Sequence, residues 1–251
     1  MQTRGGFIVA NRTLYYVSGM QHPARLAYVW LGAAVFLGSL LYFLWFYLVQ
    51  LDRVSGGGLL ALTIDVSLFS LFAVHHSVMA RPAAKRWIAQ LLPAELERST
   101  YSWISSLLFI LVCAGWQPIG GTLYEARGWL AVPFRLVQLT AVVIIARATA
   151  ALDALDLAGV RQLERQAPHG PVNLKTSGVY SLVRHPIYLG WVMFVFGAPR
   201  MTTDRAVFAI ISTLYLALAV PFEERSLIQT FGEAYSRYTD KVRWKIVPGV
   251  Y

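Results

Sequence analysis

The stretch from Thr176 to Gly190, TSGVYSLVRHPIYLG, gathers residue types that could bind a charged ligand. Proline disfavours the helical conformation in the residue before it and suits the first position of a helix. We therefore expect a helix to begin at Pro186 with His185 at its N-cap. Backbone N–H groups in the first turn would then lack helical partners and could bind a carboxylate or phosphate. These are the groups of Ile187, Tyr188 and Leu189.

Charged side chains of both signs accompany this helix start. Arg184 precedes it, and the acidic pair Glu223-Glu224 ends a later apolar run that should return to the same membrane face. A helix C-terminus disfavours negative charge, so two adjacent carboxylates there need a cationic partner. Arg184 or Arg225 could be that partner, and so could a positive group on a ligand. Amide donors on one side and carboxylates on the other would suit a zwitterionic ligand.

Aromatic rings flank the same positions. Tyr180 and Tyr188 could stack on a purine or hold a cationic centre by cation–π attraction. The alternative is that they belong to the belt of Trp and Tyr that anchors membrane proteins at the interface.

The composition predicts an integral membrane protein. Of the 251 residues, 57% are hydrophobic and only 14% are charged, and the mean hydropathy is +0.52. Soluble domains are closer to half apolar and a quarter charged. The net charge of +9 reflects basic residues beside apolar blocks, which indicates membrane topology and contact with anionic lipid and does not indicate nucleic acid. The single cysteine, Cys113, excludes an internal disulfide and a Cys-ligated metal cluster.

Long uncharged blocks predict an all-α, polytopic bundle of about six spans, with a range of five to six. The predicted spans are Ala27–Leu51, Leu59–Ala80, Tyr101–Tyr124, Trp129–Ala148, His185–Pro199 and Ala206–Phe222. The last two are short and form a helical hairpin. We expect Arg200 and Arg205, in the turn between them, to reach toward the far interface.

The residues after Glu223 predict an amphipathic helix on the membrane surface that caps the hairpin. Its apolar residues recur at spacings of three and four: Leu227, Phe231, Tyr235, Tyr238 and Val242. Alternate loops hold 17 of the 22 Lys and Arg residues, so both termini and the candidate site should be cytoplasmic.

Two units follow from this organisation. Residues 1–150 would comprise an irregular tail (1–25) and a four-span scaffold. Residues 151–251 would comprise a linker (151–175, helical up to Arg165), the hairpin and the C-terminal helix. The first 26 residues lack the apolar stretch of a signal peptide, so we expect the N-terminus to be retained.

The motif TSGVY-x3-RHP-x-Y-x-G, followed by a hairpin and EE-x2-L-x3-FG-x2-Y-x2-Y, resembles the isoprenylcysteine carboxyl methyltransferase and phospholipid methyltransferase superfamily. The resemblance covers about Asn173 to Pro248. It implies a membrane enzyme that uses S-adenosyl-L-methionine. The implied cofactor-binding residues are Val172, Asn173, Leu174, Lys175, Tyr180, His185, Pro186, Ile187, Tyr188, Glu223 and Glu224.

The first half is similar to the branch that holds the methanethiol S-methyltransferases and proteins of the NnrU type. The similar residues are LFAVHHSVMARP, from Leu71 to Pro82, and ERSTY, from Glu97 to Tyr101. This branch implies a small thiol acceptor and the inner membrane of a bacterium. Isoprenylcysteine enzymes have an arginine where this chain has Ala219, so a prenylated carboxylate is disfavoured as the substrate.

Methyl transfer to a thiol needs a positioned nucleophile and help in losing its proton. A nearby cation or base favours the attacking thiolate. The candidate catalytic residues are His76 as base, with Arg81 and Arg184 as cations. A structural hydrogen bond between helices is the alternative for His76.

The sequence also leaves alternative functions open. His75 and His76 with Asp65 fit no strong metal-ligand spacing, so we predict no metal site. The same superfamily includes enzymes for lipid amines and prenylcysteine carboxylates. A non-catalytic protein of nitrogen-oxide or haem metabolism is a further candidate, whereas a transporter is disfavoured because the spans lack a charged pathway. The sequence carries no signal for an oligomeric state.

Overall fold

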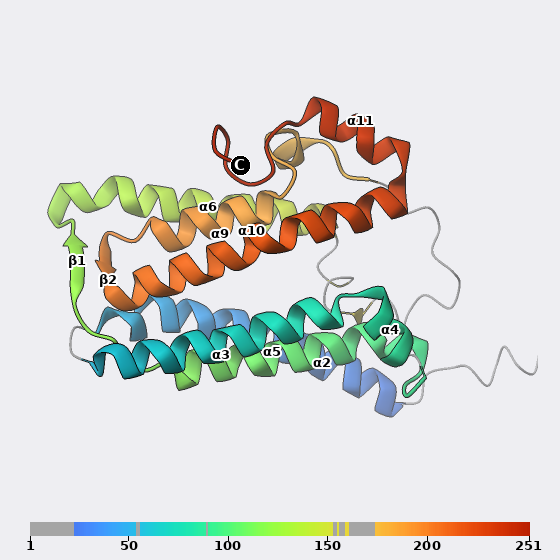
Figure 1. The fold of residues 1–251 in the computed structure, drawn as a ribbon, viewed down its shortest axis with the longest axis horizontal. Helices are drawn as coiled ribbons and strands as arrows, with labels where there is room; N and C mark the ends of the chain where they lie inside the picture. Colours follow the sequence, from blue (N-terminus) through green and yellow to red (C-terminus); the bar gives the residue numbers. More distant parts are fainter. Residues whose placement is uncertain (1–22, 54–55, 89, 153–154, 156–158, 161–173) are drawn as a thin grey trace, which may run out of the picture.

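The structure is a computed structural model in which α-helices predominate (Figure 1). The predicted tail and linker fall largely outside the described residues. The described ranges are 23–53, 56–88, 90–152, 155, 159–160 and 174–251.

Within these ranges, the bundle is built from α2 (Pro23–Leu48), α3 (Gly58–Met79), α5 (Glu97–Gly115), α6 (Ala131–Leu152), α9 (Pro186–Phe196) and α10 (Thr203–Phe231). Helices α2, α3, α6 and α10 are long and apolar enough to cross a membrane. Helix α9 has 11 residues and is therefore only about 16 Å long. The chain is a helical integral membrane protein, and the count of six spans stays a prediction.

Shorter elements connect the long helices. They are α4 (Pro82–Ile88), α11 (Glu233–Lys241), and the 3-10 turns η1 (Gln50–Asp52), η2 (Ala94–Leu96), η3 (Gly128–Leu130) and η4 (Gly178–Ser181).

Two short strands that the sequence analysis missed join the halves of the chain. Strand β1 (Thr122–Glu125) pairs antiparallel with β2 (Arg200–Thr202). The prediction that the third span continues to Tyr124 was therefore wrong at its end. Helix α5 ends at Gly115 because Trp116 leaves the helical conformation, with φ −59° and ψ 124°. Pro118, two residues later, has no N–H to continue the ladder of helical hydrogen bonds.

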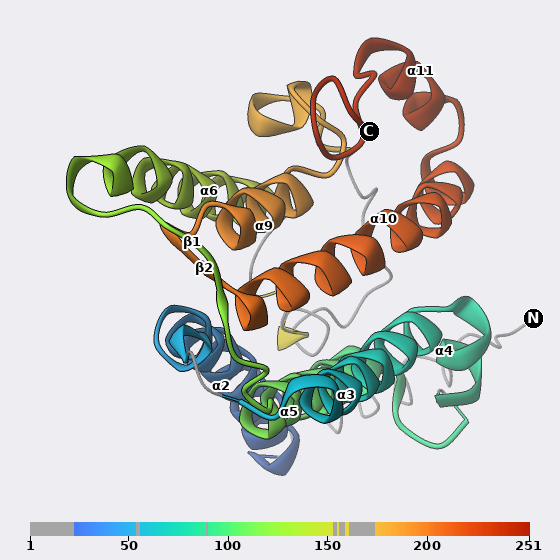
Figure 2. The ribbon, with the colours of Figure 1, turned by 60° about the vertical axis from the view of Figure 1, so that its left-hand side comes forward.

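The helices form two layers, which Figure 2 shows edge on. Helices α2, α3 and α5 make one layer, and α6, α9 and α10 make the other. Aromatic rings pack between the layers: Phe43 of α2 lies 4.8 Å from Trp191 of α9 and 5.6 Å from Phe208 of α10, measured between ring centroids. Helix α6 thus packs with the hairpin, whereas the sequence predicts a scaffold in which it accompanies the first three spans. The domain division at residue 150 stays a prediction.

The end of the bundle that carries the strands is tied by buried polar contacts. Arg205 is only 6% exposed, and it donates to Asp52 Oδ1 at 2.8 Å and to the carbonyl of Leu48 at 2.9 Å. Its Nε donates to the carbonyl of Tyr47. The expectation that Arg205 reaches toward the interface was therefore wrong. Arg200 shares the same carboxylate, with Nη1 lying 3.3 Å from Asp52 Oδ2.

Helix α10 is longer than predicted and passes the acidic pair without ending. It runs on to Phe231 and stops at Gly232, whose φ of 54° favours glycine. Helix α11 starts directly afterwards, so the predicted C-terminal helix is broken at Gly232. Its predicted apolar face is confirmed, because the residues at the helical spacing form one cluster with Leu174. These residues are Leu227, Phe231, Tyr235, Tyr238 and Val242.

Gly190, the last residue of the motif, allows α9 to approach α6 closely. A Cβ atom there would lie 2.5 Å from Ile145 Cγ1 and 2.9 Å from the carbonyl oxygen of Ala141. We expect Gly190→Ala to lower the free energy of unfolding by about 1–3 kcal/mol, because backbone atoms must move apart. The thermal unfolding midpoint in detergent micelles measures this. Gly38→Ala on α2 is the control, since a Cβ there meets nothing within 4 Å. Equal midpoints for the two variants would contradict the expectation.

Candidate functional site

The start of α9 confirms one prediction and corrects another. His185 is the N-cap and Pro186 is the first helical residue, as predicted. The N–H groups of Tyr188 and Leu189 are not free, because both donate to the carbonyl of His185, at 3.0 and 3.1 Å. The prediction of three unpaired amides was therefore wrong for these two.

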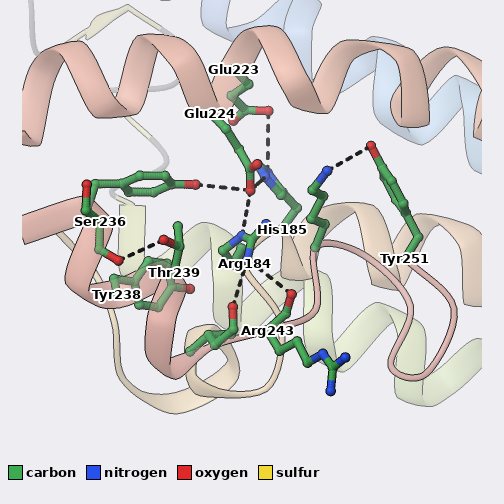
Figure 3. Close-up of polar contacts among 12 residues, drawn as sticks. Arg184, His185, Glu223, Glu224, Ser236, Tyr238, Thr239, Arg243 and Tyr251 are labelled. Atoms are coloured by element: carbon green, nitrogen blue, oxygen red, sulfur yellow. Dashed lines mark hydrogen bonds and ion pairs between the residues drawn. The ribbon is translucent and has the colours of Figure 1, made fainter.

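The chain's last residues cover the motif, which the sequence analysis did not foresee. The N–H of Arg184 donates to the carbonyl of Trp244 at 2.9 Å, and the N–H of His185 donates to that of Lys245 at 2.9 Å. Figure 3 shows this segment beside the acidic pair of α10. Aromatic residues near the C-terminus could have indicated that this segment packs against the bundle. The hydroxyl of Tyr251, for example, donates to the carbonyl of Ala217 on α10.

Arg184 and Glu224 form a buried ion pair at the centre of this arrangement (Figure 3). Arg184 Nε lies 2.6 Å from Glu224 Oε1, and their side chains are only 8% and 14% exposed. Arg184 Nη1 also donates to the carbonyls of Val242 and Arg243. These contacts fix α10 against the C-terminal segment. A catalytic role for Arg184 stays a prediction, and its contacts favour a positioning role.

Glu223 has a different environment from its neighbour. Its side chain is 43% exposed, and Oε2 accepts a hydrogen bond of 2.7 Å from the hydroxyl of Tyr188. His185 Nδ1 lies 3.5 Å from the same oxygen, and the His185 and Tyr188 rings stack at 5.3 Å. The two carboxylates thus differ in their surroundings. Glu224 forms an ion pair with Arg184, and Glu223 remains accessible.

His185 carries a buried polar atom without a partner. The side chain is 5% exposed, and Nε2 makes no hydrogen bond with any described residue, although Glu224 Oε1 lies 3.5 Å away. An unpaired buried polar atom costs free energy unless a ligand or water satisfies it. The site therefore presents an accessible carboxylate, two stacked rings and an unsatisfied ring nitrogen.

The remaining predicted cofactor residues lie in different surroundings. Tyr180 is buried, its hydroxyl reaches the carbonyl of Ala148, and burial raises its pKa to about 12. Leu174 packs in the cluster around Tyr235, and Lys175 is exposed. Two further predicted residues, Val172 and Asn173, fall outside the described residues.

Residues of the first layer reach the same end of α10. The guanidinium of Arg81 lies over the ring of Phe222, 4.1 Å from the ring centroid. Phe222 directly precedes Glu223 in α10. Ser77 on α3 donates to the hydroxyl of Tyr215, which lies two turns before Glu223 on α10. The end of α3 and the acidic pair are therefore neighbours, and a catalytic role for Arg81 stays a prediction.

A cavity of about 250 Å³ lies between the two layers. Its lining comes from α2, α3, α5, α9 and α10. The lining residues are Phe36, Ser39, Leu40, Phe69, Phe72, His76, Tyr101, Ser102, Ser105, Ser106, Phe109, Trp191, Ser212, Tyr215 and Leu216. The cavity thus combines aromatic walls with hydroxyl groups and one imidazole.

His76 lies in the wall of this cavity and is held by α5. The hydroxyl of Tyr101 is 2.9 Å from the imidazole, and Ser105 Oγ is 3.4 Å from Nδ1. Within the described residues, no group of three His, Cys, Asp or Glu side chains could hold a metal ion. Asp65, considered above with the histidines, accepts instead from the N–H of Gln117.

The sequence analysis missed most of the cavity residues. The signal was present in α5, where buried serines recur at spacings of three and four within an apolar block. These serines are Ser99, Ser102, Ser105 and Ser106. A polar stripe on one face of a membrane helix faces other helices or a cavity rather than lipid.

Known proteins resemble the chain across both layers. The profile of the family described as phospholipid methyltransferase matches residues 134–234. Methanethiol S-methyltransferase of Crocosphaera subtropica is 37% identical over 198 residues, which cover 77% of this chain and 78% of that protein. Methanethiol S-methyltransferase 2 of Bradyrhizobium diazoefficiens is 37% identical over 231 residues, covering 87% and 88%. Nurim of Rattus norvegicus is 29% identical over 181 residues, covering 67% and 69%. No solved structure matches the chain.

A helical membrane protein with these relatives and this motif is a membrane methyltransferase. The chain belongs to the phospholipid methyltransferase family, and it is similar to methanethiol S-methyltransferases over more than two thirds of its length. The resemblance read from the sequence is confirmed.

Proposed function

We propose that this chain transfers a methyl group from S-adenosyl-L-methionine to a small thiol. The observation that carries the proposal is the accessible Glu223 carboxylate beside the stacked His185 and Tyr188 rings, within the segment that matches the family profile. The names of the most similar relatives supply the thiol.

The site residues fit the chemistry of this cofactor. Glu223 would bind one of its positive groups, because a hydrogen bond between an accessible carboxylate and a cation is charge-assisted. The rings of Tyr188 and His185 would contact the adenine or the sulfonium. The unpaired Nε2 of His185 gives a polar group of the cofactor a partner. Glu224 and Arg184 hold this wall in place.

When bound beside Glu223, His185 and Tyr188, S-adenosyl-L-methionine would supply an electrophilic methyl carbon for the thiol sulfur and would leave as S-adenosylhomocysteine. His76 accepts the thiol proton, since an imidazole in reach of the acceptor is a suitable base. Tyr101 orients the imidazole through its hydrogen bond. Arg81, beside Phe222, adds positive charge that favours a thiolate. The aromatic rings in the cavity wall would reduce the access of water to the reacting groups.

The acceptor is an uncharged thiol rather than a carboxylate. Among the described residues that line the cavity, none is Lys, Arg, Asp or Glu. Ala219, which replaces the arginine of isoprenylcysteine enzymes, leaves this part of α10 without a cation. A buried carboxylate without a partner is costly.

The membrane orientation is part of the proposal. Basic residues in alternate loops favour six spans, cytoplasmic termini and a cytoplasmic site in the inner membrane of a bacterium. The surrounding lipid would also dissolve a volatile, apolar thiol.

The test is the identity of the methyl acceptor. Purified protein in lipid vesicles, given cofactor with a labelled methyl group and methanethiol, should produce labelled dimethyl sulfide in the headspace. Label found in a lipid amine or a prenylcysteine ester, with none in any thioether, would overturn the thiol assignment and keep the family.

Glu223→Gln tests the cofactor site. Glutamine still accepts from the Tyr188 hydroxyl but loses the charge, so we expect the dissociation constant for S-adenosylhomocysteine to rise about tenfold or more. Calorimetric titration in micelles measures it. The unfolding midpoint should stay within about 2 °C, because Glu223 is partly exposed. Glu233→Gln, at an exposed glutamate of α11, is the matched control and should leave both quantities unchanged. Equal loss of affinity and thermal stability would instead assign Glu223 a structural role.

A further inference from the structure

The cavity between the layers is larger than methanethiol requires. Its volume is about 250 Å³. An apolar protein cavity of about 150 Å³ is large enough to bind benzene. Methanethiol, with one carbon and one sulfur, would leave most of this space unfilled. Protein interiors hold few empty voids of this size, so we expect a ligand to occupy the cavity.

The walls specify what the occupant would be. Rings from both layers surround it, including Phe72 of α3, Phe109 of α5 and Trp191 of α9. Rings attract one another in offset or edge-to-face geometry, so the walls suit an aromatic or branched apolar group. A charged group would lose its hydration without gaining an ionic partner.

Two hydroxyls in the lining lack partners. Ser102 and Ser106 are 5% and 3% exposed, and their Oγ atoms are buried without a hydrogen bond in the described structure. Leaving such a group unsatisfied costs about 1–3 kcal/mol. A serine within a helix commonly bonds to a carbonyl of the preceding turn, as Ser67 outside the cavity does to Thr63. Ser102 and Ser106 therefore bring hydroxyls without a hydrogen-bond partner among the described residues to the cavity wall.

We propose that this cavity binds the methyl acceptor and takes neutral thiols whose organic group is as large as an aromatic ring. This rests on the proposed thiol methyltransferase function. The organic group lies among the rings, the thiol sulfur faces His76, and Ser102 and Ser106 provide hydrogen-bond donors and acceptors near it. Ser106 then limits the size of the acceptor, because any enlargement of its side chain reduces the cavity.

The test compares benzyl thiol with methanethiol in the full-length protein in lipid vesicles. Wild-type protein should methylate both. Ser106→Leu should lower kcat/KM for benzyl thiol at least tenfold and change that for methanethiol less than threefold. Ser67→Leu is the matched control, because Ser67 lies exposed on α3 and gains the same volume outside the cavity. It should leave both values unchanged.

Each outcome decides between the proposals. Turnover of methanethiol without turnover of benzyl thiol overturns the large acceptor site and leaves the proposed function standing. No turnover of either thiol overturns both. If Ser106→Leu reduces kcat/KM for both thiols equally, the cavity does not select by size.

Ser106→Ala separates packing from hydrogen bonding, since it removes the hydroxyl and keeps the space of the cavity. It should retain benzyl thiol turnover within about fivefold, and loss of all activity at an unchanged unfolding midpoint would contradict the size argument.

Discussion

Replacing Glu224 with leucine should lower the free energy of unfolding by about 3 kcal/mol or more and the thermal midpoint by about 6 °C or more. The substitution leaves the Arg184 guanidinium, whose side chain is 8% exposed, without its anionic partner. The desolvation penalty of that cation then remains uncompensated. Thermal unfolding followed by circular dichroism in detergent micelles measures the change.

A second variant distinguishes an unpaired charge from lost packing. Combining Glu224→Leu with Arg184→Met removes both charges, so it should recover at least half of the lost midpoint, since apolar replacement of a buried pair is often neutral. Glu233→Leu on α11 is the control, because its pair with Arg237 is exposed and contributes little. A single Glu224 variant as stable as the wild type would show that the pair does not hold α10 to the C-terminal segment.

His76→Gln should lower kcat for methanethiol by about 10²–10³, within the range that a general base contributes. Glutamine keeps a polar group near the Tyr101 hydroxyl, so the layer packing should survive, but it cannot take a proton. The KM for the cofactor should stay within threefold, because His76 lies in the cavity wall, whereas Glu223, the proposed cofactor ligand, lies on a different helix. Steady-state kinetics with a labelled methyl donor gives both constants.

The neighbouring histidine provides the control for this variant. His75→Gln makes the same chemical change one residue earlier on α3, and His75 is not among the cavity residues. Its kcat should stay within threefold of the wild type. A His76 variant that retains a third or more of the wild-type kcat would leave thiol deprotonation to another group. Equal loss in both variants would indicate damage to the end of α3.

The start of α9 in the candidate site could be predicted because its signals are local. Proline fixes the start of α9, so Pro186 and the N-cap His185 followed from two adjacent residues. The return of Glu223 to the same end of the bundle followed from the length of the hairpin. What local signals could not decide was which carboxylate is neutralised. That depended on Arg184 meeting Glu224, a contact across 40 residues.

Two of the incorrect predictions share one cause, which is a partner distant in the sequence, whereas the amides of Tyr188 and Leu189 have a partner only three and four residues away. Arg205 looked like an interfacial arginine, but Asp52 and carbonyls of α2 surround it. The amides of Tyr188 and Leu189 looked free, but the carbonyl of His185 turns toward them. Helix α5 ended early because the residues after it cross the bundle and pair with β2.

The sequence by itself determined the membrane class, the family and the helix start at Pro186, because apolar block length, motif residues and proline act over a few residues. Only the tertiary structure decided that α6 packs with the hairpin, that the C-terminal segment closes over Arg184, and that α2, α3 and α5 leave a cavity against α9 and α10. Packing depends on the shapes of side chains that meet from different helices, and helical periodicity does not specify which helices meet.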